Sequence, residues 1–295
     1  MLKIDTIIEI NNLYKKFGDL QVLNNISFSI PKNSIFGILG PNGSGKSTLM
    51  RIFAKLIKNW NGEILFKNNS IINSDNHLMK MGFIIESPSF YEYLSAEKNL
   101  QIFARLTNTN QKKIDELFEL VNLNDRKNSK VSEYSYGMKQ RLGIAQAMLH
   151  NPDFLILDEP NNGLDPVGIN QMADILFKLK QMGKTICIST HLLGEVDRMC
   201  TDVAILNKGK LIVSGNLNEL TRKKLFYRLE VNNSSTALND LKKIKNIEII
   251  YYLENSILIS QKKEGEPIEE NLIFKKIKDI KSLTRESSLV EYFYD

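Results

Sequence analysis

The sequence predicts an α/β protein built on a mostly parallel sheet, followed by a smaller α+β region. Short apolar segments recur up to about residue 220 without outward polar alternation. This pattern is typical of strands buried on both faces of a parallel sheet. A glycine-rich turn joins one such segment to a segment with helical spacing of apolar residues. After residue 220 the pattern changes, so we expect two domains, 1–220 and 221–295.

The expected strands follow from short runs of apolar residues along the first domain. Residues 7–13 and 20–30 alternate as strands do, and residues 34–40 form an apolar strand that runs into the glycine-rich turn. Residues 47–57 show helical spacing. Further short strands are expected at 82–85, 154–157, 185–189 and 203–207, and a hairpin-like strand at 209–215 completes the domain.

Between these strands, residues from about 93 to 150 have the pattern of helices. Two apolar faces are expected, one made of Leu100, Phe103, Ala104 and Leu106, the other of Ile114, Leu117, Phe118 and Val121. The simplest interpretation is a helical subdomain, about 88–150, inserted into the α/β core.

The C-terminal region has the pattern of a small α+β domain. Strands are expected at 225–231, 247–253 and 256–260, and helices at 236–245, 268–277 and 287–293. The helix at 268–277 is basic, yet acidic residues Glu266, Glu269 and Glu270 lie beside it. A solvated amphipathic face is therefore favoured over contact with lipid headgroups. No motif assigns a function to this domain.

Composition and charge exclude several classes of protein. Apolar residues make up 42% and charged residues 25%, ordinary values for a globular protein, and 39 basic against 34 acidic side chains give a net charge of only +5. Two cysteines are too few for a disulfide framework or a cysteine-rich metal site. Residues 1–6 lack the pattern of a signal peptide, and no apolar run approaches the roughly 18–20 residues that span a bilayer. These features favour a cytoplasmic protein.

Residues 40–47, Gly-Pro-Asn-Gly-Ser-Gly-Lys-Ser, match the phosphate-binding pattern G-x-x-x-x-G-K-[ST]. Glycines let successive backbone N–H groups face an anion, and the following helix adds its positive N-terminal end. Lys46 can reach the β- and γ-phosphates, and Ser47 can bind Mg²⁺. The alternative is a chance Gly-rich turn, which the flanking strand and helix disfavour. The expected nucleotide-binding residues are Gly40, Pro41, Asn42, Gly43, Ser44, Gly45, Lys46, Ser47 and Thr48.

Two carboxylates follow the apolar strand at 154–157, at the strand end where ligands bind in open α/β sheets. Because successive side chains point in opposite directions, Asp158 and Glu159 can have different tasks. Asp158 would hold Mg²⁺ through water, and Glu159 would orient or deprotonate the attacking water. The alternative is an acidic helix cap. The nearby phosphate loop favours the catalytic interpretation.

Residues 134–141 carry a resemblance to a known family. Tyr-Ser-Tyr-Gly-Met-Lys-Gln-Arg resembles the signature Leu-Ser-Gly-Gly-Gln of the ATP-binding subunits of ATP-binding cassette (ABC) transporters. Ser135 and Gly137 are retained, whereas Tyr136 replaces the first glycine and Met138 the glutamine. The resemblance covers about residues 7–220. It implies a P-loop NTPase fold with a RecA-like core, an antiparallel β subdomain and a helical subdomain. It also implies that this loop closes on ATP held by the opposite subunit.

Three further residues match elements of the family in the expected order. Asp165, in Asn-Gly-Leu-Asp-Pro, resembles the acid of the loop that communicates across the dimer. His191 resembles the switch histidine that contacts the γ-phosphate and takes part in catalysis. Phe17 matches the aromatic residue that stacks on adenine. A lone His after a strand, or a lone Phe, is more often structural, so these roles depend on the whole series.

One departure narrows the resemblance to a subgroup. Glu86 stands where the family usually has a glutamine near Mg²⁺, which is similar to the bacitracin and lantibiotic resistance subgroup. Residues 165–170, 191–196 and 288–293 are also similar to that subgroup. We therefore expect Glu86 to join Ser47 and Asp158 as a Mg²⁺ ligand. A solvated surface glutamate before a proline turn is the alternative.

The resemblance implies an ATP-binding and ATP-hydrolysing subunit of an exporter for antimicrobial peptides. Two copies would bind ATP and Mg²⁺ between them and drive a separate transmembrane permease, on the inner face of the cell membrane. One alternative is an exporter of another hydrophobic drug or lipid. Another is a soluble ABC ATPase acting on ribosomes, and a third is a scaffold that binds nucleotide without hydrolysis. The single phosphate loop and the spread-out charge mean that no nucleic acid partner is expected.

Overall fold

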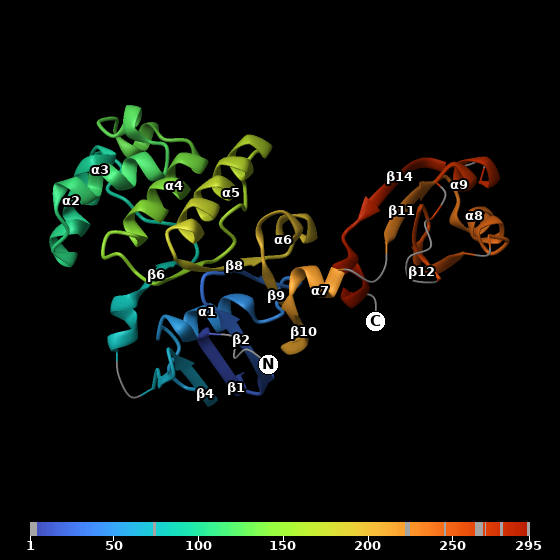
Figure 1. Cartoon of the computed structure of the whole chain (residues 1–295), viewed down its shortest axis with the longest axis horizontal. Coiled ribbons are helices and arrows are strands. Elements are labelled where there is room, and N and C mark those ends of the chain that lie inside the picture. Colours follow the sequence, from blue (N-terminus) through green and yellow to red (C-terminus); the bar gives the residue numbers. More distant parts are fainter. Residues whose placement is uncertain are drawn as a thin grey trace. The chain divides into compact units, whose positions relative to one another are not determined.

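The computed structural model of the 295-residue chain describes residues 5–72, 75–221, 225–244, 246–262, 268, 270–277 and 280–293. The chain forms two compact units, residues 1–214 and 215–295 (Figure 1). They are called here the cassette unit and the C-terminal unit. Each unit has a hydrophobic core of its own.

A six-stranded sheet forms the centre of the cassette unit, in the order β10-β9-β3-β8-β7-β6. Its strands are β3 (Ile35–Leu39), β6 (Met81–Ile84), β7 (Phe154–Leu157), β8 (Thr185–Thr190), β9 (Asp202–Asn207) and β10 (Lys210–Asn216). Strands β9, β3, β8, β7 and β6 pair in parallel, and every residue of β3, β7 and β8 is buried. The mostly parallel sheet predicted from unbroken apolar runs is therefore confirmed.

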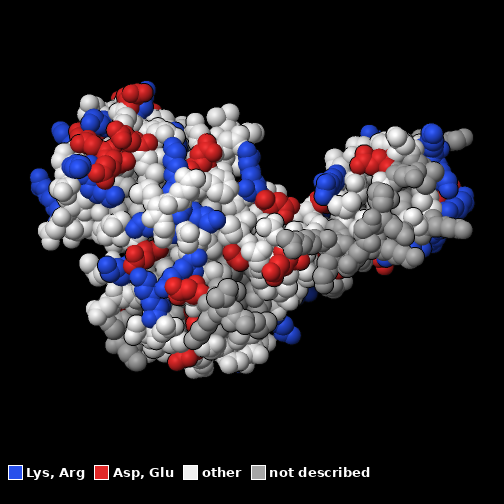
Figure 2. All heavy atoms as spheres, viewed as in Figure 1, with Lys and Arg blue, Asp and Glu red and all other residues white. Residues whose placement is uncertain are grey.

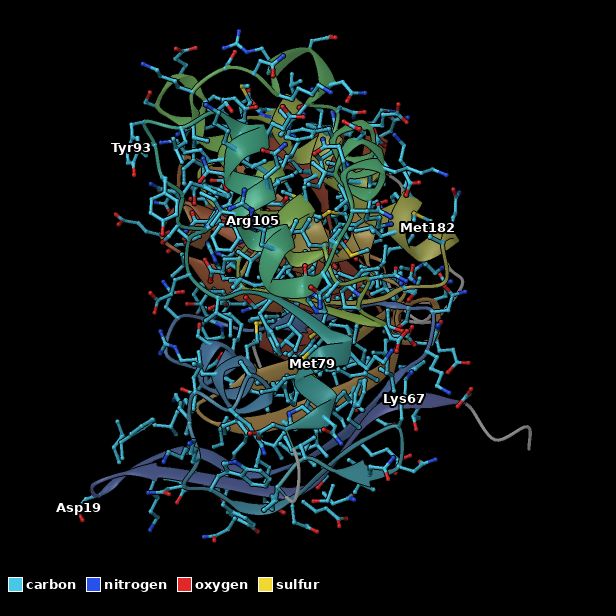
Figure 3. The ribbon with its side chains drawn as sticks, turned by 90° about the vertical axis from the view of Figure 1, so that its left-hand side faces the viewer. Asp19, Lys67, Met79, Tyr93, Arg105 and Met182 are labelled. Atoms are coloured by element: carbon cyan, nitrogen blue, oxygen red, sulfur yellow. The ribbon has the colours of Figure 1, made fainter. Side chains whose placement is uncertain are left out.

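A second, antiparallel sheet has the order β2-β1-β4-β5. Its strands are β1 (Thr6–Phe17), β2 (Leu20–Pro31), β4 (Asn61–Phe66) and β5 (Asn69–Ser70). Figure 3 shows Asp19, in the turn between β1 and β2, at one end of this sheet and Lys67 at the other. Helix α1 (Lys46–Phe53) packs its apolar side chains into the core that also contains residues of β1, β2 and β3. This helix therefore links the antiparallel sheet to the parallel one (Figure 1).

The segment between β6 and β7 is helical, as expected. It contains α2 (Ala96–Thr107), α3 (Gln111–Leu120) and α4 (Tyr136–Ala147), with short 3-10 turns at Asn124–Arg126 and Val131–Glu133, and a further 3-10 turn at Asn76–Lys80 precedes β6. Figure 1 shows these α-helices on the side of the parallel sheet away from β1, β2 and β4. Ser95 and Asn110 cap α2 and α3 by accepting hydrogen bonds from backbone N–H groups.

One expected helix face is only partly correct. The four apolar residues predicted on α3 and just after it are all buried. On α2, Leu100 and Ala104 are buried, but Leu106 is 80% exposed, so its placement on that face was wrong. Residues four apart share a helix face, whereas Leu106 lies only two positions beyond Ala104 and points away from the core.

Two further helices follow the parallel strands. Helix α5 (Pro166–Gln181) comes after β7, and α6 (Leu193–Met199) comes after β8. The buried side chains of α5 are Met172, Ala173, Ile175, Leu176 and Leu179, a helical spacing of apolar residues. In the part of the chain that the structure describes, no helix combines the length and the apolar character needed to cross a bilayer.

The C-terminal unit is built on an antiparallel sheet in the order β12-β13-β11-β14. Its elements are α7 (Leu217–Thr221), β11 (Phe226–Val231), α8 (Ser234–Leu241), β12 (Ile247–Leu253), β13 (Ser256–Gln261), α9 (Glu270–Lys276), β14 (Ile280–Glu286) and a 3-10 helix (Ser288–Phe293). Buried residues of α8 and α9, such as Leu241 and Ile273, share a core with Leu229 of β11. Strand β14 was not predicted from the sequence, because five of its seven residues are polar. Glu266 and Glu269 lie outside the described residues.

Candidate nucleotide-binding site

The glycine-rich turn predicted to bind phosphate joins β3 to α1. Gly43 and Gly45 have φ angles of 80° and 107°, in the left-handed region that favours glycine. A Cβ on Gly40 would lie 2.2 Å from the carbonyl oxygen of Leu206, and a Cβ on Gly45 would lie 2.6 Å from Cδ2 of Leu23. The turn therefore needs glycine both for its backbone conformation and for its close contacts.

The turn surrounds the side chain of Lys46. This side chain is buried, and Nζ donates hydrogen bonds to the carbonyl oxygens of Gly40 (2.8 Å) and Pro41 (3.2 Å). Burial lowers the pKa of Lys46, and the carboxylates of Glu159 and Asp158 partly oppose that shift. The arrangement holds a lysine at the N-terminal end of α1, where an anion is favoured.

The other predicted residues of the turn differ in exposure. Pro41, Asn42 and Gly43 are exposed, Ser44 and Gly45 are buried, and Ser47 and Thr48 are half-buried in the first turn of α1. The hydroxyl of Ser44 is buried without a hydrogen-bond partner in the described chain. A buried hydroxyl without a partner is costly, so a bound phosphate oxygen would satisfy it. This supports a phosphate site here.

Asp158 and Glu159 follow β7, and a hydroxyl from β8 connects them. Oγ of Ser189 donates a hydrogen bond to Oδ1 of Asp158 (2.5 Å) and accepts one from the backbone N–H of Glu159 (2.8 Å). Glu159 has a left-handed φ of 46°. Ser189 thus fixes the carboxylate of Asp158 and the backbone of Glu159. No role was predicted for Ser189, although a serine at the end of an apolar strand is a visible signal.

Glu159 and His191 lie close together at the ends of neighbouring strands. Oε1 of Glu159 is 3.3 Å from Nδ1 of His191 and 3.8 Å from Nζ of Lys46. The structure therefore brings Lys46 next to Glu159 and His191, which follow it by more than 100 positions and are themselves 32 positions apart. Glu159 is mostly shielded and His191 is 39% exposed, so water can reach the pair.

A buried glutamate holds the loop that carries His191. The hydroxyl of Thr190 donates to Oε2 of Glu195 (2.6 Å) and accepts from the backbone N–H of Leu192 (3.0 Å). Glu195 is 9% exposed. These bonds fix the backbone on both sides of His191. Glu195 was not predicted, because its position three residues after an exposed leucine gives no signal of such a contact.

The signature segment and the Asp165 loop meet around a separate cavity of about 320 Å³. Ser135 caps α4 by accepting a hydrogen bond from the N–H of Met138 (3.3 Å), and Asp165 caps α5 by accepting one from Gly168 (2.7 Å). Tyr136 and Gly137 also line this cavity, whose described residues all come from α4, α5 and the segments before them. Two helix N-termini, each capped by its own side chain, therefore line one space.

Glu86 lies in the loop after β6, with a left-handed φ of 70°. Its carboxylate is 68% exposed and forms an ion pair with Arg51 in the last turn of α1. Helix α1 begins at Lys46, so this ion pair connects the loop of Glu86 to the phosphate-binding helix. Arg51 was not predicted as a partner of Glu86, because the two residues are 35 positions apart.

The described residues fit a magnesium–nucleotide complex. Ser47 offers a hydroxyl at the start of α1, and Asp158 offers a nearly buried carboxylate at the end of β7. Oxygen ligands of this kind, completed by phosphates and water, are those that Mg²⁺ prefers. Among the residues that the structure describes, no group of three or more His, Cys, Asp or Glu side chains could hold a metal alone.

Phe17 stands at the end of β1, with half of its ring surface exposed. The hairpin that carries it lies against the phosphate loop, because a Cβ on Gly45 would meet Leu23 and Val22. Figure 2 shows Lys and Arg beside Asp and Glu over the drawn face of the cassette unit, so this face carries charges of both signs.

Comparisons with known proteins agree with this geometry. The sequence profile of the family described as "ABC transporter" matches residues 23–162. The uncharacterized ABC transporter ATP-binding protein YhcH of Bacillus subtilis is 42% identical over 83% of this chain and 83% of its own length. The bacitracin transport ATP-binding protein BcrA of Enterococcus faecalis is 40% identical over 77% of this chain and 75% of its own. The lantibiotic transport ATP-binding protein SrtF of Streptococcus pyogenes is 38% identical over 75% of this chain and 98% of its own length.

Solved structures are similar over about three quarters of the chain. CbiO1 from Clostridium perfringens, part of an ABC transporter complex, has a TM-score of 0.67 and 29% identity, covering 73% of this chain and 90% of its own. The expected nucleotide-binding fold is thereby confirmed.

Proposed function

The chain belongs to the ATP-binding proteins of the ABC transporter family, and on that premise we propose that it hydrolyses ATP to drive export of antimicrobial peptides through a separate permease. The observation that carries the ATPase proposal is the position of Glu159. Its carboxylate lies within 4 Å of both Lys46 of the phosphate loop and His191. The proposed base Glu159, the phosphate-binding cation Lys46 and the polar ring of His191 thus lie close together.

In this proposal each residue of the site has a separate task. Glu159 orients the attacking water and accepts its proton, and His191 contacts the γ-phosphate. Lys46 and the backbone N–H groups of residues 40–45 bind the phosphates, and Phe17 stacks on adenine. Ser47, Asp158 and Glu86 would hold Mg²⁺, and the ion would supply positive charge beside the phosphates.

We further propose that two copies of the chain form the working unit. The cavity between α4 and α5 supports this, because Ser135 and Asp165 place two helix N-termini beside one space. In a dimer, Ser135–Met138 of one subunit would close on ATP bound to the phosphate loop of the other, and Asp165 would contact the partner. Residues 1–220 would form this cassette, with 88–150 as its helical subdomain, and 221–295 an accessory domain.

The choice of cargo comes from the relatives. BcrA is named for bacitracin transport and SrtF for lantibiotic transport. Both cargoes are antimicrobial peptides, so export of such a peptide, giving resistance or immunity, is the favoured function. The permease would place this chain at the inner face of the cell membrane.

The test is expression in a peptide-sensitive bacterium with and without the permease. We expect resistance to bacitracin or a lantibiotic only when both proteins are present, and its loss in Lys46→Ala. Resistance to unrelated drugs alone would favour another hydrophobic cargo. Copurification with ribosomes, without any permease, would contradict the transport function.

A further inference from the structure

A buried lysine lies against the ring of Phe17. Nζ of Lys15 is 4.5 Å from the centroid of the Phe17 ring. Both residues lie on β1, two positions apart, with an irregularity of the β1–β2 ladder just after Lys15. Lys15 is 7% exposed whereas Phe17 is 48% exposed. One face of the ring is therefore covered by an ammonium group, and a large part of the ring remains open to solvent.

The ammonium group of Lys15 is held in place from its other side. Nζ donates a hydrogen bond to the carbonyl oxygen of Asn59 (2.5 Å), in the segment just before β4. The amide of Gln21 also donates to the backbone carbonyl oxygen of Lys15 (3.3 Å). The lysine is thus fixed by groups outside the turn of the hairpin, and the cation in turn limits the orientations of the exposed ring.

The hairpin also has a fixed position relative to the phosphate loop. Lys15 pairs with Leu23 across the β1–β2 ladder. Leu23 is the residue whose Cδ2 a Cβ on Gly45 would meet at 2.6 Å. The lysine, the ring and the phosphate-binding turn are therefore connected through one pair of strands.

We propose that Lys15 is a positioning residue that orients the ring of Phe17 for stacking on the base of the nucleotide. This rests on the proposed role of Phe17 in ATP binding. An exposed aromatic side chain loses rotamer freedom when a base stacks on it, which weakens binding. A cation fixed beneath the ring reduces that loss and polarises the ring toward the base. In this proposal Lys15 strengthens binding of the base and not binding of the phosphates.

The competing explanation is that Lys15 attracts the phosphates by its charge. The two explanations predict different dependence on the base. An effect through Phe17 requires a base and an aromatic ring at position 17. A direct attraction requires neither, and it would act equally on ATP and on inorganic tripolyphosphate.

The experiment measures dissociation constants of the full chain for ATP and for inorganic tripolyphosphate by calorimetry. The variants are Lys15→Met, Phe17→Leu and the double variant. Lys16→Met is the matched control, because it removes the same charge from the adjacent, exposed position. Lys15→Gln is a second variant that keeps a donor for Asn59. The fluorescence of Trp60, the only tryptophan of the chain, shows that each variant is folded.

We expect Lys15→Met and Lys15→Gln to weaken ATP binding about threefold to tenfold, with tripolyphosphate binding and Lys16→Met unchanged. In the Phe17→Leu background, removal of Lys15 should have no further effect. The inference is overturned if the Lys15 variants weaken binding of ATP and of tripolyphosphate equally. It is also overturned if removing Lys15 has the same effect in the Phe17→Leu background, or if Lys15→Met leaves ATP binding unaltered. Failure of the unmutated chain to bind ATP at all would instead contradict the proposed function.

Discussion

The carboxylate of Glu159 lies 3.3 Å from Nδ1 of His191. The two residues come from the ends of neighbouring parallel strands, β7 and β8, and their side chains meet beside the phosphate loop. This pairing makes His191 the natural partner of the proposed base. Replacing the imidazole of His191 tests this role.

His191→Ala is expected to lower ATP turnover about tenfold to a thousandfold while ATP binding changes little. The imidazole is partly exposed and contacts Glu159, so its loss affects the reacting end of the nucleotide more than the base or the α-phosphate. Steady-state hydrolysis and equilibrium binding of ATP check this. A matched loss of affinity and turnover would contradict it.

Ser189→Ala removes the hydroxyl that connects Asp158 to the backbone of Glu159. The buried carboxylate of Asp158 then loses a partner, which costs about 1–3 kcal/mol of stability. Misplacement of Asp158 should also raise the Mg²⁺ concentration needed for half-maximal turnover. Cys187→Ala, on the same buried strand, is the control. A Mg²⁺ requirement that changes equally in both variants would count against this role.

Glu86→Gln tests the departure from the family pattern. The ion pair with Arg51 is on the surface, so its loss should change the free energy of unfolding by less than about 1 kcal/mol. We expect ATP binding to persist but the coupling of hydrolysis to transport to change. Arg51→Met breaks the same pair and leaves the carboxylate in place, which separates the two roles. Unchanged resistance and unchanged cargo-stimulated turnover in Glu86→Gln would refute the coupling role.

The two cysteines should be inert in the folded protein. Cys187 and Cys200 are free and buried, and burial raises the pKa of both thiols well above its usual value. A thiol that stays protonated and inaccessible reacts slowly with alkylating reagents. Titration with a chromogenic disulfide reagent should detect almost no thiol in the native protein and both after denaturation. Rapid native labelling would show that β8 or the end of α6 opens readily.

The main elements of the site could be predicted because short stretches of consecutive residues determine them. The glycine-rich turn and the strand before Asp158 each occupy fewer than ten consecutive residues, and parallel pairing brings their ends together. The position of Leu106 was wrong because helical spacing turns it away from Ala104, two positions before it. Strand β14 was missed because its polar residues resemble a loop, and pairing with β11 decides its conformation.

Contacts between distant residues could not be read from the sequence. Ser189 meets Asp158 across 31 positions, and Arg51 meets Glu86 across 35. No short pattern marks such a pair, because either side chain alone is an ordinary polar residue at the end of an element. The structure adds these partners, together with Lys15 beneath Phe17.

The most direct measurement of the central proposal is ATP turnover and ATP binding by Glu159→Gln. The amide keeps the shape of the side chain but cannot accept the proton of the attacking water. We predict that turnover falls at least about a hundredfold whereas ATP is bound as tightly as by the unmutated chain. Turnover at the unmutated rate would contradict the role of Glu159 as the base, and with it the mechanism proposed for this site.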